Sequence, residues 1–117
     1  EEGYLFLTDR QKDMIISGGA NIYPAEVEAI LFNHPAVGDC TVIGVPDVQW
    51  GEKVKAIVEL RGQANETEII EFCRANLAHY KCPTSVDFVT KLPRDPNGKV
   101  RKREVREPYW ADAGRTI

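Results

Sequence analysis

The stretch Asp13–Glu28, DMIISGGANIYPAEVE, decides the fold that this sequence predicts. Its first five residues, Asp13–Ser17, are mainly apolar and indicate a short strand. Two adjacent glycines then predict a loop over Ser17–Asn21, because glycine adopts positive φ at little cost. Pro24 suits the first turn of a helix. We expect that helix to end before Pro35, since a residue that precedes proline disfavours the α conformation.

The residues before this stretch indicate a second strand over Tyr4–Thr8. It is separated from Asp13–Ser17 by four polar residues, so the two strands predict a small hairpin. The opening residues Glu1–Leu7 also resemble the turn and second strand of a further hairpin. We therefore expect a preceding domain in a longer protein.

The residues after the stretch predict a three-stranded sheet with further helices. Val37–Val45 and Val54–Leu60 are rich in β-branched residues and flank a polar loop, which favours an antiparallel pair. The later expected elements are a helix over Glu66–His79, a strand over Ser85–Val89, a polar loop over Thr90–Gly98 and a basic helix over Lys99–Arg106. The sequence thus predicts an α+β fold: a small hairpin, then a mainly three-stranded sheet packed with helices.

Composition excludes several classes of function. The chain has 117 residues, a formal net charge of -3 and a pI near 5.4, so we expect one domain and no nucleic-acid partner. No apolar run approaches the roughly 18 residues of a membrane span, which predicts no transmembrane segment. The three cysteines lack C-x-x-C spacing, which favours a reducing, cytoplasmic setting without disulfides. No metal cluster, catalytic triad or P-loop stands out, and His34 and His79 lack ligand-spaced partners.

Two motifs carry a resemblance to a known family. Thr8–Glu28, TDRQKDMIISGGANIYPAEVE, is similar almost position by position to the hinge motif of AMP-forming acyl- and aryl-CoA synthetases. Leu92–Lys102, LPRDPNGKVRK, resembles the final motif of the same adenylate-forming superfamily. The resemblance runs in order from Gly3 to about Arg106 and implies the C-terminal domain of such an enzyme.

The resemblance implies that Lys99 is the catalytic lysine of this domain. When a carboxylate attacks the α-phosphate of ATP, two anions approach each other, and an ammonium group stabilises the charge that develops. Arg10 resembles the arginine that bonds the ribose hydroxyls of ATP, a task suited to a planar, permanently charged donor. Lys12 occupies the hinge position about which these enzymes exchange two conformations.

A second group of residues resembles the family's coenzyme A face. Gly18 and Gly19 match the loop along the pantetheine tunnel, where a missing Cβ permits close approach. Trp50 matches a segment near CoA or the domain interface. Tyr80 and Lys81 match an aromatic-lysine pair that in some relatives contacts the CoA nucleotide, although Cys82 and Thr84 depart from that pattern by lacking basic side chains.

The implied activity is an ATP-dependent acyl-CoA ligation, which proceeds through acyl-AMP. The expected organisation is a hairpin remnant and hinge over residues 1–12, a mobile lid domain over 13–106 and a tail over 107–117. ATP, CoA and Mg²⁺ would serve the full-length enzyme, and we expect none to bind this chain tightly. The expected partners are its N-terminal domain, ATP or AMP, CoA and a carboxylic acid, by motif similarity a fatty acid. Two alternatives stay open: the lid of an adenylation domain that loads a carrier protein, and a free-standing binding module without activity of its own.

Overall fold

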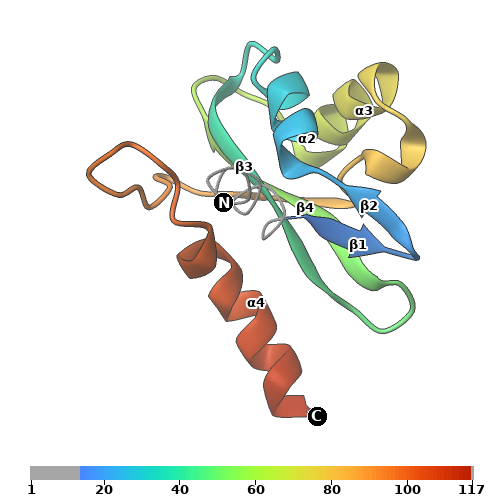
Figure 1. The fold of residues 1–117 in the computed structure, drawn as a ribbon. Helices are drawn as coiled ribbons and strands as arrows, with labels where there is room; N and C mark the ends of the chain where they lie inside the picture. Colours follow the sequence, from blue (N-terminus) through green and yellow to red (C-terminus); the bar gives the residue numbers. More distant parts are fainter. Residues whose placement is uncertain (1–13, 117) are drawn as a thin grey trace, which may run out of the picture.

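The computed structural model describes residues 14–116, with side-chain surroundings for residues 14–111. The strand predicted over Tyr4–Thr8, the ribose contact of Arg10 and the hinge at Lys12 lie outside these residues. Within them, a three-stranded sheet is joined to a two-stranded hairpin and to helices on both sides of the sheet (Figure 1). The predicted α+β fold is confirmed.

The main sheet has the strand order β3-β4-β5. β3 (Val37–Asp47) and β4 (Gly51–Leu60) are antiparallel, as predicted, and pair from Asp47–Gly51 to Val37–Leu60. β5 (Ser85–Phe88) pairs in parallel with β4, as expected for a strand that returns after a helical crossover. β3 and β4 are each a few residues longer than predicted, so the loop between them is shorter than expected.

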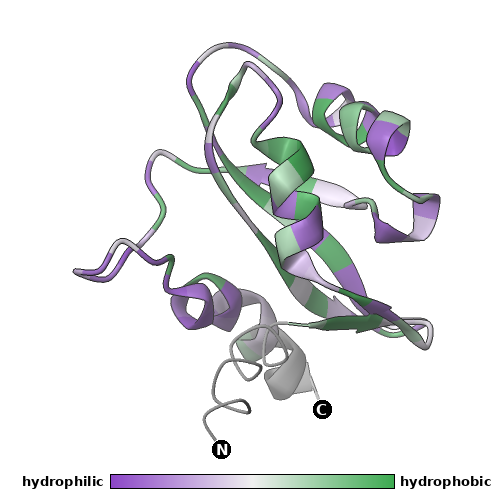
Figure 2. Cartoon of the chain, turned by 45° about the horizontal axis from the view of Figure 1, so that its top comes forward, coloured by the Kyte–Doolittle hydropathy of each residue, from purple (hydrophilic) through white to green (hydrophobic). Residues whose placement is uncertain are grey.

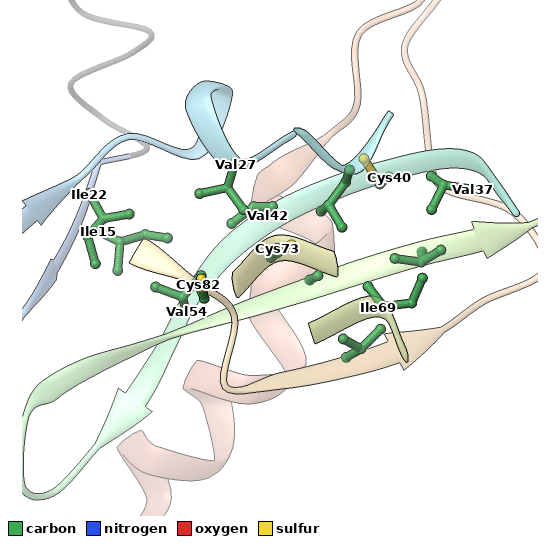
Figure 3. Packing of buried hydrophobic residues seen from close by; sticks show 14 residues of the cluster. Ile15, Ile22, Val27, Val37, Cys40, Val42, Val54, Ile69, Cys73 and Cys82 are labelled. Atoms are coloured by element: carbon green, nitrogen blue, oxygen red, sulfur yellow. The ribbon is translucent and has the colours of Figure 1, made fainter. Parts of the chain in front are cut away.

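Alternation along the strands divides the core between two faces of this sheet. On one face, α2 (Pro24–Leu31) and α3 (Glu66–Asn76) cover inward-facing residues such as Val42, Ala56 and Val58 (Figures 1 and 3). On the other face, Val105 and Tyr109 of α4 (Lys102–Thr116) pack against a smaller buried cluster. That cluster comprises Ile43, Val45, Ile57 and Leu92. Figure 2 shows apolar residues along the strands between these helices.

The described hairpin is formed by β1 (Ile15–Ser17) and β2 (Ala20–Ile22), and the predicted pairing of Tyr4–Thr8 with Asp13–Ser17 lies outside the described residues. β1 pairs with β2, so the predicted loop Ser17–Asn21 is a tight turn followed by a strand. The turn residues Gly18 and Gly19 have φ of 58° and 87°. Positive φ at both positions is the geometry of a type I′ turn, which matches the twist of antiparallel strands. The prediction of a loop here was therefore wrong.

The helices correct three further boundaries. α3 is capped by Asn65, whose Oδ1 accepts a bond from Glu68 N at 2.8 Å. It ends at Asn76 rather than His79, and a 3-10 turn, η1 (His79–Lys81), follows. The basic helix begins three residues later than predicted, and it continues through Pro108 to Thr116.

Side chains seal the outer edge of β3. The N–H of Val42 donates to Glu28 Oε2 at 2.9 Å, and its carbonyl accepts from Lys102 Nζ at 3.2 Å. The carbonyl of Gly44 accepts a 2.9 Å bond from Trp110 Nε1. An exposed strand edge is a site for pairing with other chains. Here α2 and α4 occupy backbone groups that a further strand would otherwise use.

The three cysteines are buried and free. Cys40, Cys73 and Cys82 lie in the core cluster beneath α2 and α3 (Figure 3). Burial raises the pKa of Cys73 to about 12 and also raises the pKa of Cys40 and Cys82. A thiol with a raised pKa is a poor nucleophile, so these cysteines serve packing. Among residues 14–116, no helix has the length and apolar character that crossing a bilayer requires.

Candidate functional site

The glycine turn and Trp50 form one structural unit. The N–H of Gly18 donates to the carbonyl of Trp50 at 2.8 Å, and the indole ring lies over the glycine. A Cβ at Gly18 would lie 2.4 Å from Cε3 of Trp50, whereas one at Gly19 would meet nothing within 4 Å. Glycine is therefore required at position 18 for two reasons: the close contact with the Trp50 ring and the positive φ. Gly19 keeps an open approach to the turn.

Trp50 is held by the short loop between β3 and β4. Oδ2 of Asp47 accepts bonds from Trp50 N at 2.7 Å and Gln49 N at 3.2 Å. The bond from Trp50 N is the main cause that lowers the pKa of Asp47, and Lys53 lowers it further. With its backbone fixed, Trp50 leaves about half of its surface, 52%, exposed. A large apolar surface of this kind typically marks a contact with a ligand or another domain.

Tyr80 and Lys81 lie in η1. Nζ of Lys81 pairs with Glu26 of α2 at 2.9 Å and lies 5.7 Å from the centre of the Tyr80 ring. Its hydrogen bond to Glu26 raises the pKa of Lys81. The Tyr80 ring is 56% exposed. In Figure 1, the segment after α3 that contains η1 and the β1–β2 turn lie at the same end of the molecule.

Lys99 lies in a tightly bonded loop between β5 and α4. Oδ1 of Asp95 accepts bonds from Lys99 N at 3.0 Å and Asn97 N at 2.9 Å. The carbonyl of Lys99 accepts a 2.9 Å bond from Asp95 N. Gly98 has φ of 89°, which closes the turn just before the lysine. The backbone of Lys99 is therefore fixed at both its amide and its carbonyl.

The candidate residues separate into two regions. The segment between β5 and α4, which carries Lys99, projects on one side of the molecule, and the β1–β2 turn and η1 lie on the opposite side (Figures 1 and 2). Gly18 and Trp50 are brought into direct contact. The ammonium group of Lys81 lies over the Tyr80 ring and pairs with Glu26.

The sequence left two supporting residues unassigned. Arg94 pairs with Asp39 of β3 through both of that side chain's oxygens, and it also donates to the carbonyl of Gly98. Asp39 and Arg94 are 55 positions apart, so periodicity gave no signal for the pair. The position of Arg94 inside the motif Leu92–Lys102 was the one signal in the sequence that pointed to a role for this residue.

Comparison with known proteins decides the family. A family model, the AMP-binding enzyme C-terminal domain, matches residues 26–99, more than half of the chain. The chain belongs to this family. The matched region of this AMP-binding enzyme C-terminal domain ends at Lys99 and includes Trp50, Tyr80 and Lys81. The Gly18–Gly19 turn lies before the matched region.

Relatives of this AMP-binding enzyme C-terminal domain are ligases of several kinds. The long-chain-fatty-acid–CoA ligase FadD13 of Mycobacterium tuberculosis is 48% identical over 95% of the chain and 22% of its own length. A 2-succinylbenzoate–CoA ligase of Bacillus cereus is 48% identical over 92% of the chain and 22% of its own length. The fatty acid–[acyl-carrier-protein] ligase ScoC of Streptomyces coeruleorubidus is 41% identical over the whole chain and 23% of its own length.

The fold of this AMP-binding enzyme C-terminal domain also matches solved structures. A Mycobacterium tuberculosis fatty acyl-CoA synthetase superposes with a TM-score of 0.81 at 47% identity, over 86% of this chain and 20% of that one. The chain therefore spans about a fifth of the length of the proteins it matches. Within residues 14–116, no group of three or more His, Cys, Asp or Glu side chains is arranged to hold a metal ion.

Proposed function

We propose that this domain is the mobile C-terminal lid of an ATP-dependent acyl-CoA ligase. In such an enzyme a carboxylate and ATP give acyl-AMP and pyrophosphate, and the thiol of CoA then displaces AMP. One observation carries the proposal: the Lys99 loop and the Gly18–Trp50 unit lie on opposite sides of one small fold. The two regions can serve one reaction centre in turn if the domain reorients between the steps.

In the first step, we assign Lys99 to the adenylation site. Its ammonium group would contact the carboxylate and the α-phosphate, where it stabilises the negative charge of the transition state. The fixed backbone of the loop supports this role, because preorganised charge needs no rearrangement during the reaction. Arg10 would bond the ribose hydroxyls, and the ligands of Mg²⁺ would come from ATP and the N-terminal domain.

In the second step, a rotation about Lys12 would present the opposite face to CoA. The open approach at Gly19 and the exposed ring of Trp50 suit the narrow pantetheine arm. Tyr80 has an exposed ring that can stack on a base, and Lys81 lies beside it. Since Lys81 is paired with Glu26, a CoA phosphate would have to compete for it.

The central test removes the lysine from the full-length ligase. We expect Lys99→Ala to remove nearly all acyl-dependent pyrophosphate release, down to a small residual rate, while thioester formation from supplied acyl-adenylate is largely retained. Lys12→Pro is expected to block one conformation by fixing φ. Equal loss of both half-reactions in Lys99→Ala would contradict this division of labour, and a complete reaction in Lys12→Pro would contradict the hinge.

We propose a fatty acid as the substrate and the cytoplasm as the location. The similarity to FadD13 supports a fatty acid, while the equal identity to a 2-succinylbenzoate ligase leaves an aromatic acid as an outcome of the test. A panel of carboxylates with ATP and magnesium, assayed for pyrophosphate and acyl-CoA, names the acid. Product from one class of acid alone identifies the substrate.

A second candidate changes only the acceptor of the acyl group. The similarity to ScoC, a ligase that acts on an acyl-carrier protein, extends over the whole chain. In that case the enzyme would release pyrophosphate and hold acyl-AMP without forming any CoA product. The same assay with CoA present or withheld separates the two acceptors.

A further inference from the structure

The loop that carries Lys99 is fastened to β3 through a forked arginine contact. Nε of Arg94 lies 3.0 Å from Oδ2 of Asp39, and Nη2 lies 2.5 Å from Oδ1 and 2.6 Å from Oδ2. A guanidinium that engages both oxygens of a carboxylate is fixed in direction as well as in distance. Asp39 therefore sets the orientation of Arg94.

The same guanidinium reaches the backbone next to Lys99. Its Nη1 donates to the carbonyl of Gly98, which belongs to the peptide unit that joins Gly98 to Lys99. Arg94 also pairs with Val100 in an isolated antiparallel bridge, so it spans the base of the loop. One side chain thus connects a strand of the main sheet to the peptide group that precedes the Cα of Lys99.

The strand end of this connection is itself well defined. The β3–β4 register shifts between Val37 and Asp39, where a bulge interrupts the pairing. Bulges commonly redirect side chains next to functional sites. Oδ1 of Asp39 also accepts a 2.9 Å bond from Cys40 N, so the orientation of the carboxylate is fixed by β3 as well as by Arg94.

The other end of the loop is anchored by a separate contact. Lys102, three residues after Lys99, pairs with Glu28 at 2.9 Å and bonds the carbonyl of Val42. Both ends of the loop that contains Lys99 are therefore attached to β3 or to the helix beside it. Arg94 bonds the carbonyl of the Gly98–Lys99 peptide group, and Oδ1 of Asp95 accepts a bond from the N–H of the same group. Of the two side chains, only that of Arg94 also links this peptide group to β3.

We propose that Arg94, oriented by Asp39, is the positioning residue for Lys99. Arg94 does not act on the substrates; it fixes the peptide from which the catalytic side chain extends. The inference rests on the proposed adenylation role of Lys99. The expected effect is selective. Loss of the contact between Arg94 and both oxygens of Asp39 would slow adenylation, which uses Lys99, and would leave the rate of thioester formation on the opposite face of the domain unchanged.

The test uses the full-length ligase and follows each half-reaction separately. Arg94→Lys keeps the charge but loses the fork, and Asp39→Asn keeps the shape but removes the charge that orients it. We expect either change to slow adenylation by about 10–100-fold, because a small displacement of a catalytic group has effects of this size. Thioester formation from supplied acyl-adenylate should stay within about twofold, and the unfolding midpoint within about 4 °C.

Two controls make the result specific to Lys99. Arg101→Lys is the same substitution at an exposed arginine of the same segment, whose side chain pairs with Glu104, and we expect both half-reactions to keep their rates. In a Lys99→Ala background, Arg94→Lys should slow the residual adenylation by less than about twofold, because residues that act as one unit are not additive.

The outcomes separate the inference from the proposed function. Equal slowing of both half-reactions, or loss of stability alone, would overturn the positioning role of Arg94. If Lys99→Ala slows adenylation selectively and Arg94→Lys does not, the inference alone fails. If Lys99→Ala itself spares adenylation, the proposed function fails and the inference fails with it.

Discussion

Trp50 covers Gly18 so closely that a β-carbon on the glycine would lie 2.4 Å from Cε3 of the indole. Gly18 also has φ of 58°, which side-chain-bearing residues adopt at a cost. We expect Gly18→Ala to lower the free energy of unfolding by about 2–4 kcal/mol, as strain and overpacking combine. Urea denaturation of this chain measures the effect.

Gly19→Ala is the matched control for that prediction. Its φ of 87° gives strain, but its β-carbon would meet nothing within 4 Å. A loss of only about 1–2 kcal/mol is therefore expected. Combining Gly18→Ala with Trp50→Ala should cost less than the sum of the two single changes. Strict additivity would show that the indole is not the obstacle.

The contact between Lys102 and Glu28 gives a second prediction about stability. Lys102→Met keeps the aliphatic stem but removes the donor that serves both the Glu28 carboxylate and the carbonyl of Val42. We expect a loss of about 1–3 kcal/mol, because partly buried acceptors lose a charged partner. Lys53→Met should cost less than about 1 kcal/mol, because the side chain of Lys53, which pairs with Asp47, is 46% exposed whereas that of Lys102 is 18% exposed. Equal effects would argue against a special role for the β3 edge.

The pair of Asp87 and Tyr109 predicts an acid dependence of stability. Burial opposes ionisation of Asp87, but hydrogen bonds from Tyr109 and Lys55 outweigh it and lower the pKa of Asp87. A lowered folded-state pKa stabilises the fold above the unfolded-state value, and this stabilisation is lost as the pH falls through the folded-state value. The difference in stability between the native chain and Asp87→Asn should thus be present at neutral pH and shrink below about pH 4. Denaturation at a series of pH values checks this, and a constant difference would refute it.

Tyr109 predicts the opposite behaviour at high pH. Burial and the bond to Asp87 raise its pKa to about 12, above the ordinary value near 10. The associated stability is complete below about pH 10 and is lost as the pH rises toward 12. Tyr109→Phe should abolish this dependence, which unfolding midpoints at alkaline pH would record. An unchanged alkaline profile in that variant would assign the loss to other groups.

The buried thiols predict slow chemical modification. Burial raises the pKa of Cys73 to about 12 and raises that of the other two cysteines. We expect a thiol reagent at pH 8 to label the cysteines of the folded chain slowly. In denaturant, the same reagent should label all three cysteines of the chain rapidly. Rapid labelling of the folded chain would show that the core opens readily.

The sequence predicted the elements whose signals are local. The β-branched residues of Val37–Val45 and Val54–Leu60 predicted the antiparallel pair of β3 and β4, and the apolar spacing after Asn65 predicted α3. The positive φ of the glycines was expected, but the strand β2 was missed because two glycines are compatible with many loops. The choice of a tight hairpin depends on Trp50, which is distant in sequence and meets the turn only after folding.

The length of α4 was also beyond local signals. Proline inside a helix removes a hydrogen bond and costs about 3 kcal/mol, so Pro108 disfavours the continuation of α4. The two residues that follow it are tied to the sheet: Tyr109 bonds Asp87, and Trp110 bonds the carbonyl of Gly44. Tertiary contacts of this kind outweigh local propensity. The Asp39–Arg94 pair was hidden for the same reason, since only the fold brings its members together.

The sealed edge of β3 also limits how far the C-terminus of this domain can be shortened. The carbonyl of Gly44 accepts a hydrogen bond from Trp110, and the carbonyl of Val42 accepts one from Lys102. The last helix therefore protects a strand that would otherwise be a template for self-association. A shortened protein that ends at Arg106 would retain the Lys102 contact and lose the one from Trp110. Recombinant versions that stop there should aggregate more readily than versions that include α4 to Thr116.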